Sequence, residues 1–146
     1  MALLHPPKVG AVVLCAFPEE LVPPEMVKTR PVAVISPRIQ GRHDIVTVVP
    51  LSTTEPTPLL PHHCEIPIRL MPKTLQAEAV RVWAKCDMLY TFSLARLDRF
   101  KAGRDRETGK RLFEVGQLEP TQVIDIRRCV AAGLGITHDL LVPRDP

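Results

Sequence analysis

The chain has 146 residues, a length that suits one domain with a single hydrophobic core. Hydrophobic residues make up 45% of it, which excludes wholesale disorder, and a formal net charge of +3 is too small to indicate nucleic-acid binding by itself. The 16 prolines are about twice the usual share, so they favour short elements cut by stiff turns and argue against a helical bundle.

Three apolar runs in the first part of the chain predict strands, over residues 9–17, 30–36 and 45–52. The segment between the first two, 18–29, is rich in proline and long enough to form a mobile flap. The third run is rich in β-branched residues, but Pro50 near its end favours an edge strand or a bulge there.

Arg30 stands at the mouth of the second predicted strand, directly before Pro31. A proline fixes its own φ at about −65° and pushes the preceding residue toward an extended conformation. Arg30 is therefore held by its backbone. Its guanidinium either reaches back to water or points at an anion, and the local pattern alone leaves both interpretations open.

The following segments are shorter. Residues 64–70 alternate and predict a strand, which Pro67 places on an edge. Residues 78–93 form either one strand or two strands joined by a turn. The two-residue period puts Val80, Val82 and Ala84 on one face and Arg81, Trp83 and Lys85 on the other.

Ser93 is suited to cap a short helix over residues 94–100. The charged segment 101–116 resembles a hairpin with Gly103 and Gly109 at its turns. A final helix is expected over 120–133, since Pro120 suits a first turn and Val123, Ile126, Val130 and Leu134 recur at helical spacing. Together these elements predict a small, strongly bent antiparallel sheet or barrel with a helix packed on it, followed by a frayed tail over 136–146.

Positive charge is concentrated in the second half of the chain. Between Arg69 and Arg111 there are 11 Lys and Arg residues and only 5 acidic ones. This stretch either attracts a polyanion or is a solvated basic face without a partner.

The four cysteines stand singly, so the paired spacing of a zinc ribbon is absent, and we expect them to be reduced core residues. The N-terminal residues lack the apolar core of a signal peptide, and no apolar run approaches the roughly 20 residues that span a bilayer. The sequence therefore predicts a cytoplasmic protein that does not enter a membrane.

Three polar clusters follow or precede the predicted strands: residues 25–30, the hydroxyls of Ser52, Thr53 and Thr54, and the pair Lys85 and Asp87. We expect Lys85 and Asp87 to share one face of a strand. Cations stabilise charge that develops on a phosphate, and a carboxylate can take a proton from an attacking hydroxyl, so the set suits attack on a phosphodiester without a metal. The alternatives are an ordinary turn at 51–55 and a surface ion pair worth under about 1 kcal/mol.

Two further features of the sequence are aromatic. His62 and His63 are adjacent, so on a strand they point to opposite faces, which argues against a metal site. Trp83 either stacks on a nucleic-acid base or is a packing anchor.

The order of these segments resembles the PemK/MazF family, toxins of bacterial type II toxin–antitoxin pairs. The resemblance covers about residues 9–135 and lies in "GAVVLCAFP", "KTRPVAVIS", "TVVPLSTT", "HHCEIPI" and "VWAKCDMLYTFSLARLDR", followed by the terminal helix. It implies a single domain over 1–146, mainly β, built as an SH3-like small barrel of bent antiparallel strands with a C-terminal helix. It also implies a homodimer that needs no metal or other cofactor.

The resemblance further implies the site. Arg30 falls on the arginine that acts at the scissile phosphate, and Ser52 on a catalytic threonine or serine. Lys85 and Asp87 align with the basic and acidic pair of an "RCD" motif, in which the carboxylate is the proposed base and the arginine, here a lysine, the proposed acid. The expected supporting residues are Glu25, Lys28, Thr53, Thr54 and Trp83.

The implied function is metal-independent cleavage of single-stranded RNA, including mRNA, by attack of the 2′-hydroxyl. Translation and growth would be inhibited until a cognate antitoxin neutralises the toxin. The alternative is a non-catalytic barrel that binds RNA or poisons a protein target such as gyrase. The charged set of Arg30, Lys85 and Asp87 favours the nuclease, because a gyrase binder would not need it.

Overall fold

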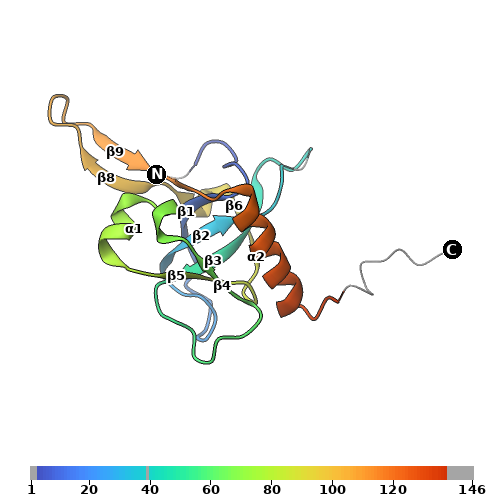
Figure 1. Ribbon diagram of the computed structural model, residues 1–146. Coiled ribbons are helices and arrows are strands. Elements are labelled where there is room, and N and C mark those ends of the chain that lie inside the picture. Colours follow the sequence, from blue (N-terminus) through green and yellow to red (C-terminus); the bar gives the residue numbers. More distant parts are fainter. Residues whose placement is uncertain (1–2, 39, 138–146) are drawn as a thin grey trace.

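The computed structural model describes residues 3–38 and 40–137, and antiparallel strands dominate it (Figure 1). The main sheet contains β1 (Ala11–Ala16), β2 (Thr29–Val34), β3 (Ile45–Ser52), β4 (His63–Ile66), β5 (Val82–Lys85), β6 (Tyr90–Ser93), β7 (Leu97–Asp98) and β10 (Gly116–Gln117). A separate hairpin consists of β8 (Phe100–Arg104) and β9 (Arg111–Glu114). The helices are α1 (Lys73–Glu78) and α2 (Pro120–Gly133), with 3₁₀ turns at Ile68–Leu70 and Leu94–Arg96.

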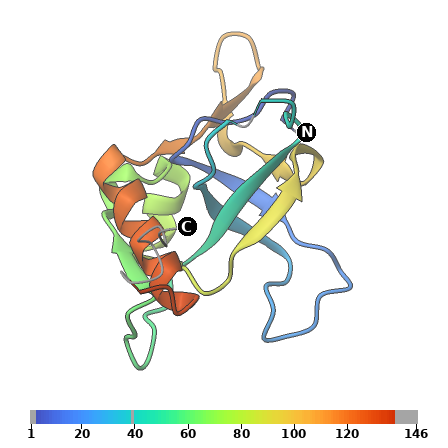
Figure 2. The same cartoon turned by 90° about the vertical axis from the view of Figure 1, so that its right-hand side faces the viewer.

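The main sheet has the strand order β10-β1-β2-β3-β5-β4, with β6 paired to β3 and β7 paired to β1. It curls into a half-barrel, and α2 packs beside β4 at one end of it (Figure 2). The expected class, mainly β with a bent antiparallel sheet and a C-terminal helix, is confirmed.

Apolar side chains lie on both faces of the curled sheet, which explains the continuous apolar runs of β1 to β3. In β1, Val12 belongs to the cluster beneath α2, which includes Ile126 and Val130. Its neighbours Val13 and Cys15 belong to a second cluster on the opposite face, closed by Leu97 and other side chains. Successive residues of β1 therefore enter different cores, and neither face of the strand can carry a charge over residues 11–15.

Several expected elements are confirmed. The strands over 9–17, 30–36 and 45–52 are found as β1, β2 and β3, and the helix over 120–133 as α2. The charged segment forms a hairpin, as expected, with Gly109 in its turn, but Gly103 lies within β8, where the register shifts between Lys101 and Arg104, and not at a turn. For the segment 78–93, one strand and two strands joined by a turn were both possible, and the structure has the two strands. The expected frayed tail falls mostly on 138–146, which lie outside the described residues.

Pro50 does not make β3 an edge strand, contrary to expectation. β3 is central: it pairs with β2 on one side and with both β6 and β5 on the other. On that second side β6 pairs with Ile45 to Val48 and β5 with Leu51 and Ser52, so Pro50 lies between the two partners. A proline is tolerated there because the ladder is already interrupted at its position.

Two predictions, one of a strand and one of a helix, were wrong in detail. The strand expected over 64–70 ends at Ile66, because Pro67 leads into the 3₁₀ turn Ile68–Leu70. The short helix expected over 94–100 is a single 3₁₀ turn, after which the chain returns to extended structure in β7. Ser93 does cap that turn, since its Oγ accepts a hydrogen bond from the Ala95 amide at 3.2 Å.

Candidate active site

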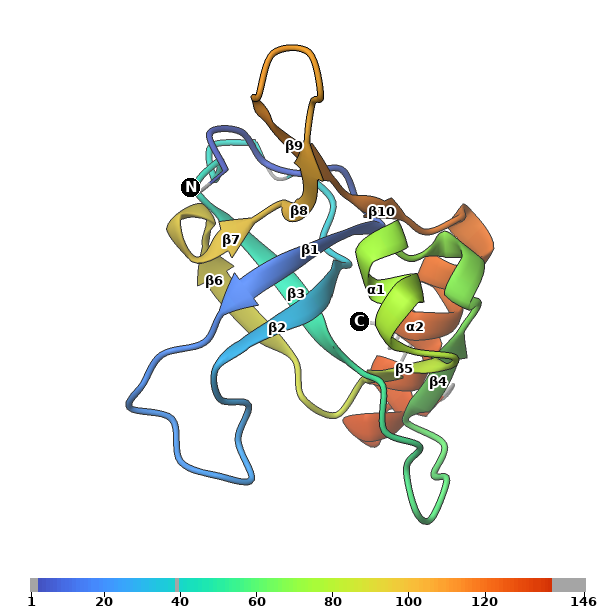
Figure 3. The same ribbon diagram turned by 90° about the vertical axis from the view of Figure 1, so that its left-hand side faces the viewer.

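A groove of about 780 Å³ is lined by the start of β2, the ends of β3 and β5, α1 and the start of β8. Figure 3 shows how these elements are arranged. Five of the predicted site residues line the groove: Arg30, Ser52, Thr53, Thr54 and Lys85. The structure therefore brings together residues from segments that are far apart in the sequence. Two cations and three hydroxyl groups share one concave surface.

Arg30 lies in β2 next to Pro31, and its backbone pairs with Cys15 of β1. Its side chain is exposed, and Nε donates a hydrogen bond to the Val27 carbonyl at 3.2 Å. The residue is thus held in place both by the strand and by its own side chain. Arg30 is exposed and lines the groove, so its guanidinium is accessible both to water and to an anion bound there.

Ser52 is the last residue of β3 and pairs with Trp83 of β5. Its Oγ accepts a hydrogen bond from the Thr54 amide at 3.2 Å. This bond uses the oxygen as an acceptor, so the hydroxyl proton can still be donated to a ligand. The segment is both a turn and a wall of the groove.

Lys85 ends β5, where it pairs with His63 of β4, and its half-buried side chain lines the groove. Asp87 does not share its strand face, contrary to expectation. The strand stops at Lys85, and the Met88 amide donates to the Lys85 carbonyl at 3.1 Å, which closes a turn. The two-residue period therefore does not extend to Asp87, which is outside the groove lining.

Asp87 instead faces His62, with 3.5 Å between Asp87 Oδ2 and His62 Nε2. The end of α2 packs against this pair, since a Cβ built on Gly133 would lie 3.2 Å from the Cα of Asp87 and from the Cβ of His62. The carboxylate is exposed, with 44% of its side chain accessible. It is held loosely by one partner and not enclosed.

The sequence predicts that His62 and His63 point to opposite faces of a strand, and this prediction is wrong. Their ring centroids are 4.3 Å apart, because His62 precedes β4 and belongs to a turn. Ligand atoms of both rings and of Asp87 lie within 4.8 Å of one another. However, the Leu60 amide donates to His63 Nδ1 at 3.0 Å. A neutral His63 then carries its proton on Nε2, which leaves no lone pair for a metal, so the geometry fits a hydrogen-bonded group.

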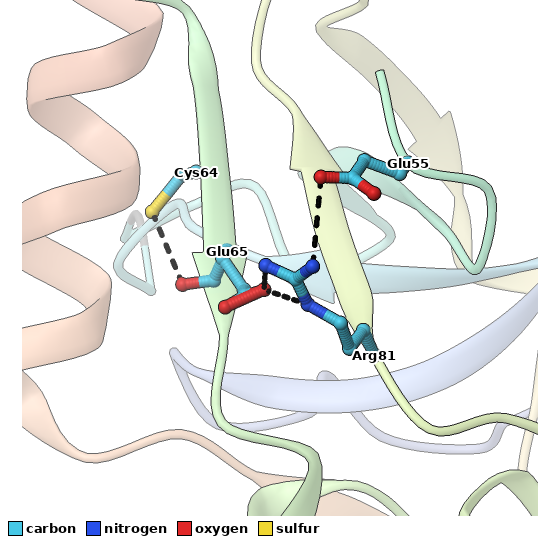
Figure 4. Close-up of polar contacts among 4 residues, drawn as sticks. All are labelled: Glu55, Cys64, Glu65 and Arg81. Atoms are coloured by element: carbon cyan, nitrogen blue, oxygen red, sulfur yellow. Dashed lines mark hydrogen bonds and ion pairs between the residues drawn. The ribbon is translucent and has the colours of Figure 1, made fainter. Parts of the chain in front are cut away.

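The ring of Trp83 is buried, with 3% of the residue exposed, and the guanidinium of Arg81 covers it at 4.8 Å. Arg81 is fixed by Glu65 at 2.6 Å and by Glu55 at 3.5 Å (Figure 4). Of the two roles considered for Trp83, this arrangement is that of a packing anchor. The ring presents no open face on which a base could stack.

Glu25 and Lys28 lie in the flap between β1 and β2 and are outside the groove lining. Glu25 Oε2 accepts a hydrogen bond from the Val22 amide at 2.6 Å, so it stabilises a turn of the flap. Lys28 has a φ of 67°, a left-handed conformation that lets the chain turn into β2. In this structure both residues shape the flap, whose Met26 lines the groove together with Thr29 at the start of β2.

Sequence reasoning missed one side of the groove, which is lined by Thr74, Glu78, Arg99 and Lys101. Thr74 and Glu78 belong to α1, a helix that was not predicted. The available signal was Pro72 followed by "KTLQAE", good helix formers after a proline. Glu78 matters because it places a carboxylate in the groove lining, which also contains Asp98.

Comparison with known proteins gives a consistent result. The model of the family described as PemK-like, MazF-like toxin of type II toxin–antitoxin system matches residues 8–134. The chain is 32% identical over 121 residues to the protein YifN of Escherichia coli (strain K12), which covers 71% of this chain and 80% of YifN.

Solved structures share the fold. An endoribonuclease from a mycobacterial species, solved in complex with its cognate antitoxin, superposes with a TM-score of 0.57 at 20% identity, over 90% of this chain and 98% of that one. MazF from Deinococcus radiodurans superposes with a TM-score of 0.56 at 16% identity, over 88% of this chain and 96% of that one. Within the described residues, the model contains no helix of the length and apolar character needed to cross a membrane.

Proposed function

Because the chain belongs to the PemK-like, MazF-like toxins of type II toxin–antitoxin systems, we propose that it is an endoribonuclease that cleaves single-stranded RNA. The observation that carries this proposal is the groove, whose lining contains Arg30, Lys85 and Ser52 and so combines a guanidinium, an ammonium and a hydroxyl. Such a set binds a phosphodiester and stabilises the charge that it gains during cleavage. A barrel that only occupied a protein target would not need it.

The proposed reaction uses the 2′-hydroxyl of the RNA. Its oxygen attacks the adjoining phosphorus, and the new O2′–P bond forms as the P–O5′ bond breaks. The products are a 2′,3′-cyclic phosphate and a 5′-hydroxyl. A carboxylate takes the proton of the 2′-hydroxyl, and a cationic side chain donates a proton to the leaving O5′.

Arg30 and Lys85 are assigned to the phosphate, and Lys85 is the proton donor. Asp87 is our candidate for the base. It follows Lys85 closely along the chain, and exposed side chains change rotamer within nanoseconds, so its contact with His62 does not fix it. Glu78, which already lines the groove, is the rival for this role. Comparing Asp87→Asn with Glu78→Gln assigns the base to whichever variant loses activity.

Two of the partners are part of the proposal. A mycobacterial relative was solved with its cognate antitoxin, and we expect an antitoxin to neutralise this chain by covering the groove. We also expect a homodimer. Sedimentation that shows only monomer at micromolar concentration would contradict the second expectation.

The first test is cleavage of a long RNA in millimolar EDTA by the wild-type protein and by Arg30→Ala. We expect wild-type cleavage to persist in the chelator. Arg30→Ala should lower the rate by at least about 100-fold, since groups that stabilise transition-state charge contribute that much. Its fold should be intact, because the exposed Arg30 contributes little to the core.

Arg38→Ala is the matched control. Arg38 is also an exposed arginine beside a proline, and its Nη2 donates to the Pro6 carbonyl at 3.3 Å, away from the groove. It should cleave RNA at the wild-type rate. Retained cleavage by a folded Arg30→Ala protein would remove Arg30 from the site, and normal cleavage at a 2′-deoxy nucleotide would exclude the mechanism.

A further inference from the structure

The β8–β9 hairpin projects from the body of the molecule beside the groove (Figures 1 and 3). Its base forms one wall of that groove, through Arg99, Phe100 and Lys101. β8 has 5 residues, so at about 3.4 Å per residue the strand extends roughly 17 Å. The reaction proposed above assigns no role to any residue of this hairpin or of its base.

The exposed charges of the hairpin are mainly positive. Five cations lie on it: Lys101, Arg104, Arg106, Lys110 and Arg111. Within the part of the chain that the structure describes, none of these five forms an ion pair with a carboxylate. We call the segment 100–114 the basic arm.

Two acids of the basic arm are engaged in its own architecture. Asp105 Oδ1 accepts hydrogen bonds from the amides of Thr108 and Glu107 at 2.9 and 2.8 Å, and these bonds hold the pKa of its carboxyl below the usual value. Glu114 Oε1 accepts from the amide and the hydroxyl of Thr74 at 2.8 and 2.7 Å, which lowers its pKa likewise. These carboxylates shape the arm instead of pairing with its cations.

The basic arm is anchored and not a loose loop. Phe100 is buried at its base, and Arg99 lies 4.1 Å above the ring of Phe113. Thr74 of α1 holds both strands, since it bonds to Glu114 of β9 and donates through Oγ1 to the Lys101 carbonyl of β8 at 3.1 Å. The helix that lines the groove therefore also fixes the direction of the arm.

We propose that the basic arm binds the backbone phosphates of the RNA strand where it leaves the groove. The inference rests on the proposed function and extends its substrate site. Arg30, Lys85, Arg99 and Lys101 all line the groove, and Lys101 is also the first cation of the arm, so a polyanionic strand bound in the groove can extend onto the arm. Recognition is by charge, because neither aromatic ring of the arm is open to a base: Phe100 is buried and Phe113 is covered by Arg99.

The test compares two triple variants of equal charge. Arg106→Ser/Lys110→Ser/Arg111→Ser removes arm cations whose side chains make no hydrogen bond within the described structure. Lys8→Ser/Arg42→Ser/Arg128→Ser removes three exposed cations that are neither in the arm nor in the groove lining. The probe is a mixed-sequence 2′-O-methyl RNA that cannot be cleaved, titrated at several salt concentrations.

We expect the arm variant to bind at least about 10-fold more weakly at low salt. The slope of log K against log salt should become shallower by about 2, since each phosphate contact on a single strand contributes about 0.7. The control variant should keep the wild-type slope. Thermal melting of all three proteins checks that the fold is retained.

An arm variant with wild-type affinity and slope would overturn the proposal. So would an arm variant that binds RNA normally but no longer binds an acidic antitoxin segment, because the arm would then be a protein-binding surface. If the slopes differ between the wild-type protein and the arm variant as expected but the wild-type protein does not cleave RNA, the nuclease assignment is wrong and the RNA-binding role of the arm is supported. If the wild-type protein cleaves RNA but the two slopes are equal, the RNA-binding role of the arm is wrong and the nuclease assignment is supported.

Discussion

At the scale of single residues, His63 shows how the local structure sets a protonation state. Burial lowers the pKa of its imidazole below the usual 6.5, and neighbouring His62 and Lys85 add to that effect while Asp87 opposes it. The Leu60 amide, which donates to Nδ1, is compatible with the neutral ring. The folded protein therefore binds this proton more weakly than the unfolded chain does.

This difference in proton binding predicts the direction in which stability changes with pH. Between the lowered pKa and 6.5 the unfolded chain binds more protons, so the free energy of unfolding should rise with pH in that window. Below both pKa values the loss of stability should level off. We expect the melting temperature of His63→Asn to depend less on pH below 6.5 than that of the wild-type protein.

His5→Asn replaces an exposed histidine and serves as the control. Its melting temperature should follow the wild-type pH dependence. Equal pH dependence in His63→Asn and the wild-type protein would show that the proton binds His63 equally in both states.

The site residues were predictable from sequence to different degrees. Arg30 could be placed because a proline constrains its backbone, and Ser52 because it ends a strand with a clear pattern. Asp87 and His62 do not lie where the sequence predicts. The prediction applies the two-residue period of a strand to both, but β5 ends at Lys85 and β4 begins at His63, so both residues belong to turns. Nothing in the sequence marks where β5 stops, since the closing bond joins two backbone groups.

At the scale of elements, β10 depends on the absence of a side chain at Gly116. A Cβ there would lie 2.9 Å from the Leu70 carbonyl oxygen, from Pro72 Cδ and from Val12 Cβ. The glycine thus lets β10 pair with β1 while the segment before α1 crosses it closely.

Gly116→Ala should lower the free energy of unfolding by about 1–3 kcal/mol, the usual cost of overpacking a core. Urea unfolding followed by circular dichroism measures it. Because the neighbours include backbone, a flexible side chain cannot relieve the contact. A midpoint equal to that of the wild-type protein would mean that the crossing segment moves aside at little cost.

Elements in which apolar residues recur at a regular spacing could be predicted from the sequence. Elements whose position depends on tertiary contacts could not. α2 was predicted because Val123, Ile126 and Val130 are buried at helical spacing. α1 has only 6 residues and buries Leu75 alone, so its pattern is too short to detect. Its position depends on contacts with the hairpin, which sequence reasoning could not place.

At the scale of the whole molecule, the thiols are distributed through the core and are protected by it. Burial raises the pKa of Cys15 to about 12. Burial, with Cys129 nearby, raises the pKa of Cys64 to about 12 and raises that of Cys86 as well. The thiolate is the reactive form, so these groups are poor nucleophiles in the folded protein.

We therefore expect Cys15, Cys64 and Cys86 to react slowly with a thiol reagent at pH 8 in the native protein, and all 4 cysteines to react rapidly in denaturant. Cys64 gives the clearest test, because it is only half-buried. A reagent can reach it, so slow reaction there reflects the raised pKa and not only limited access. Rapid labelling of Cys64 in the folded protein would contradict the raised pKa.

The covered ring of Trp83 has a spectroscopic consequence. It is the only tryptophan of the chain, so the intrinsic fluorescence excited through tryptophan reports a single position. That position is buried under Arg81 and pairs across the sheet with Ser52, which lines the groove. Emission should therefore respond both to the loss of the Arg81 cover and to occupancy of the groove, and binding can be followed without a label.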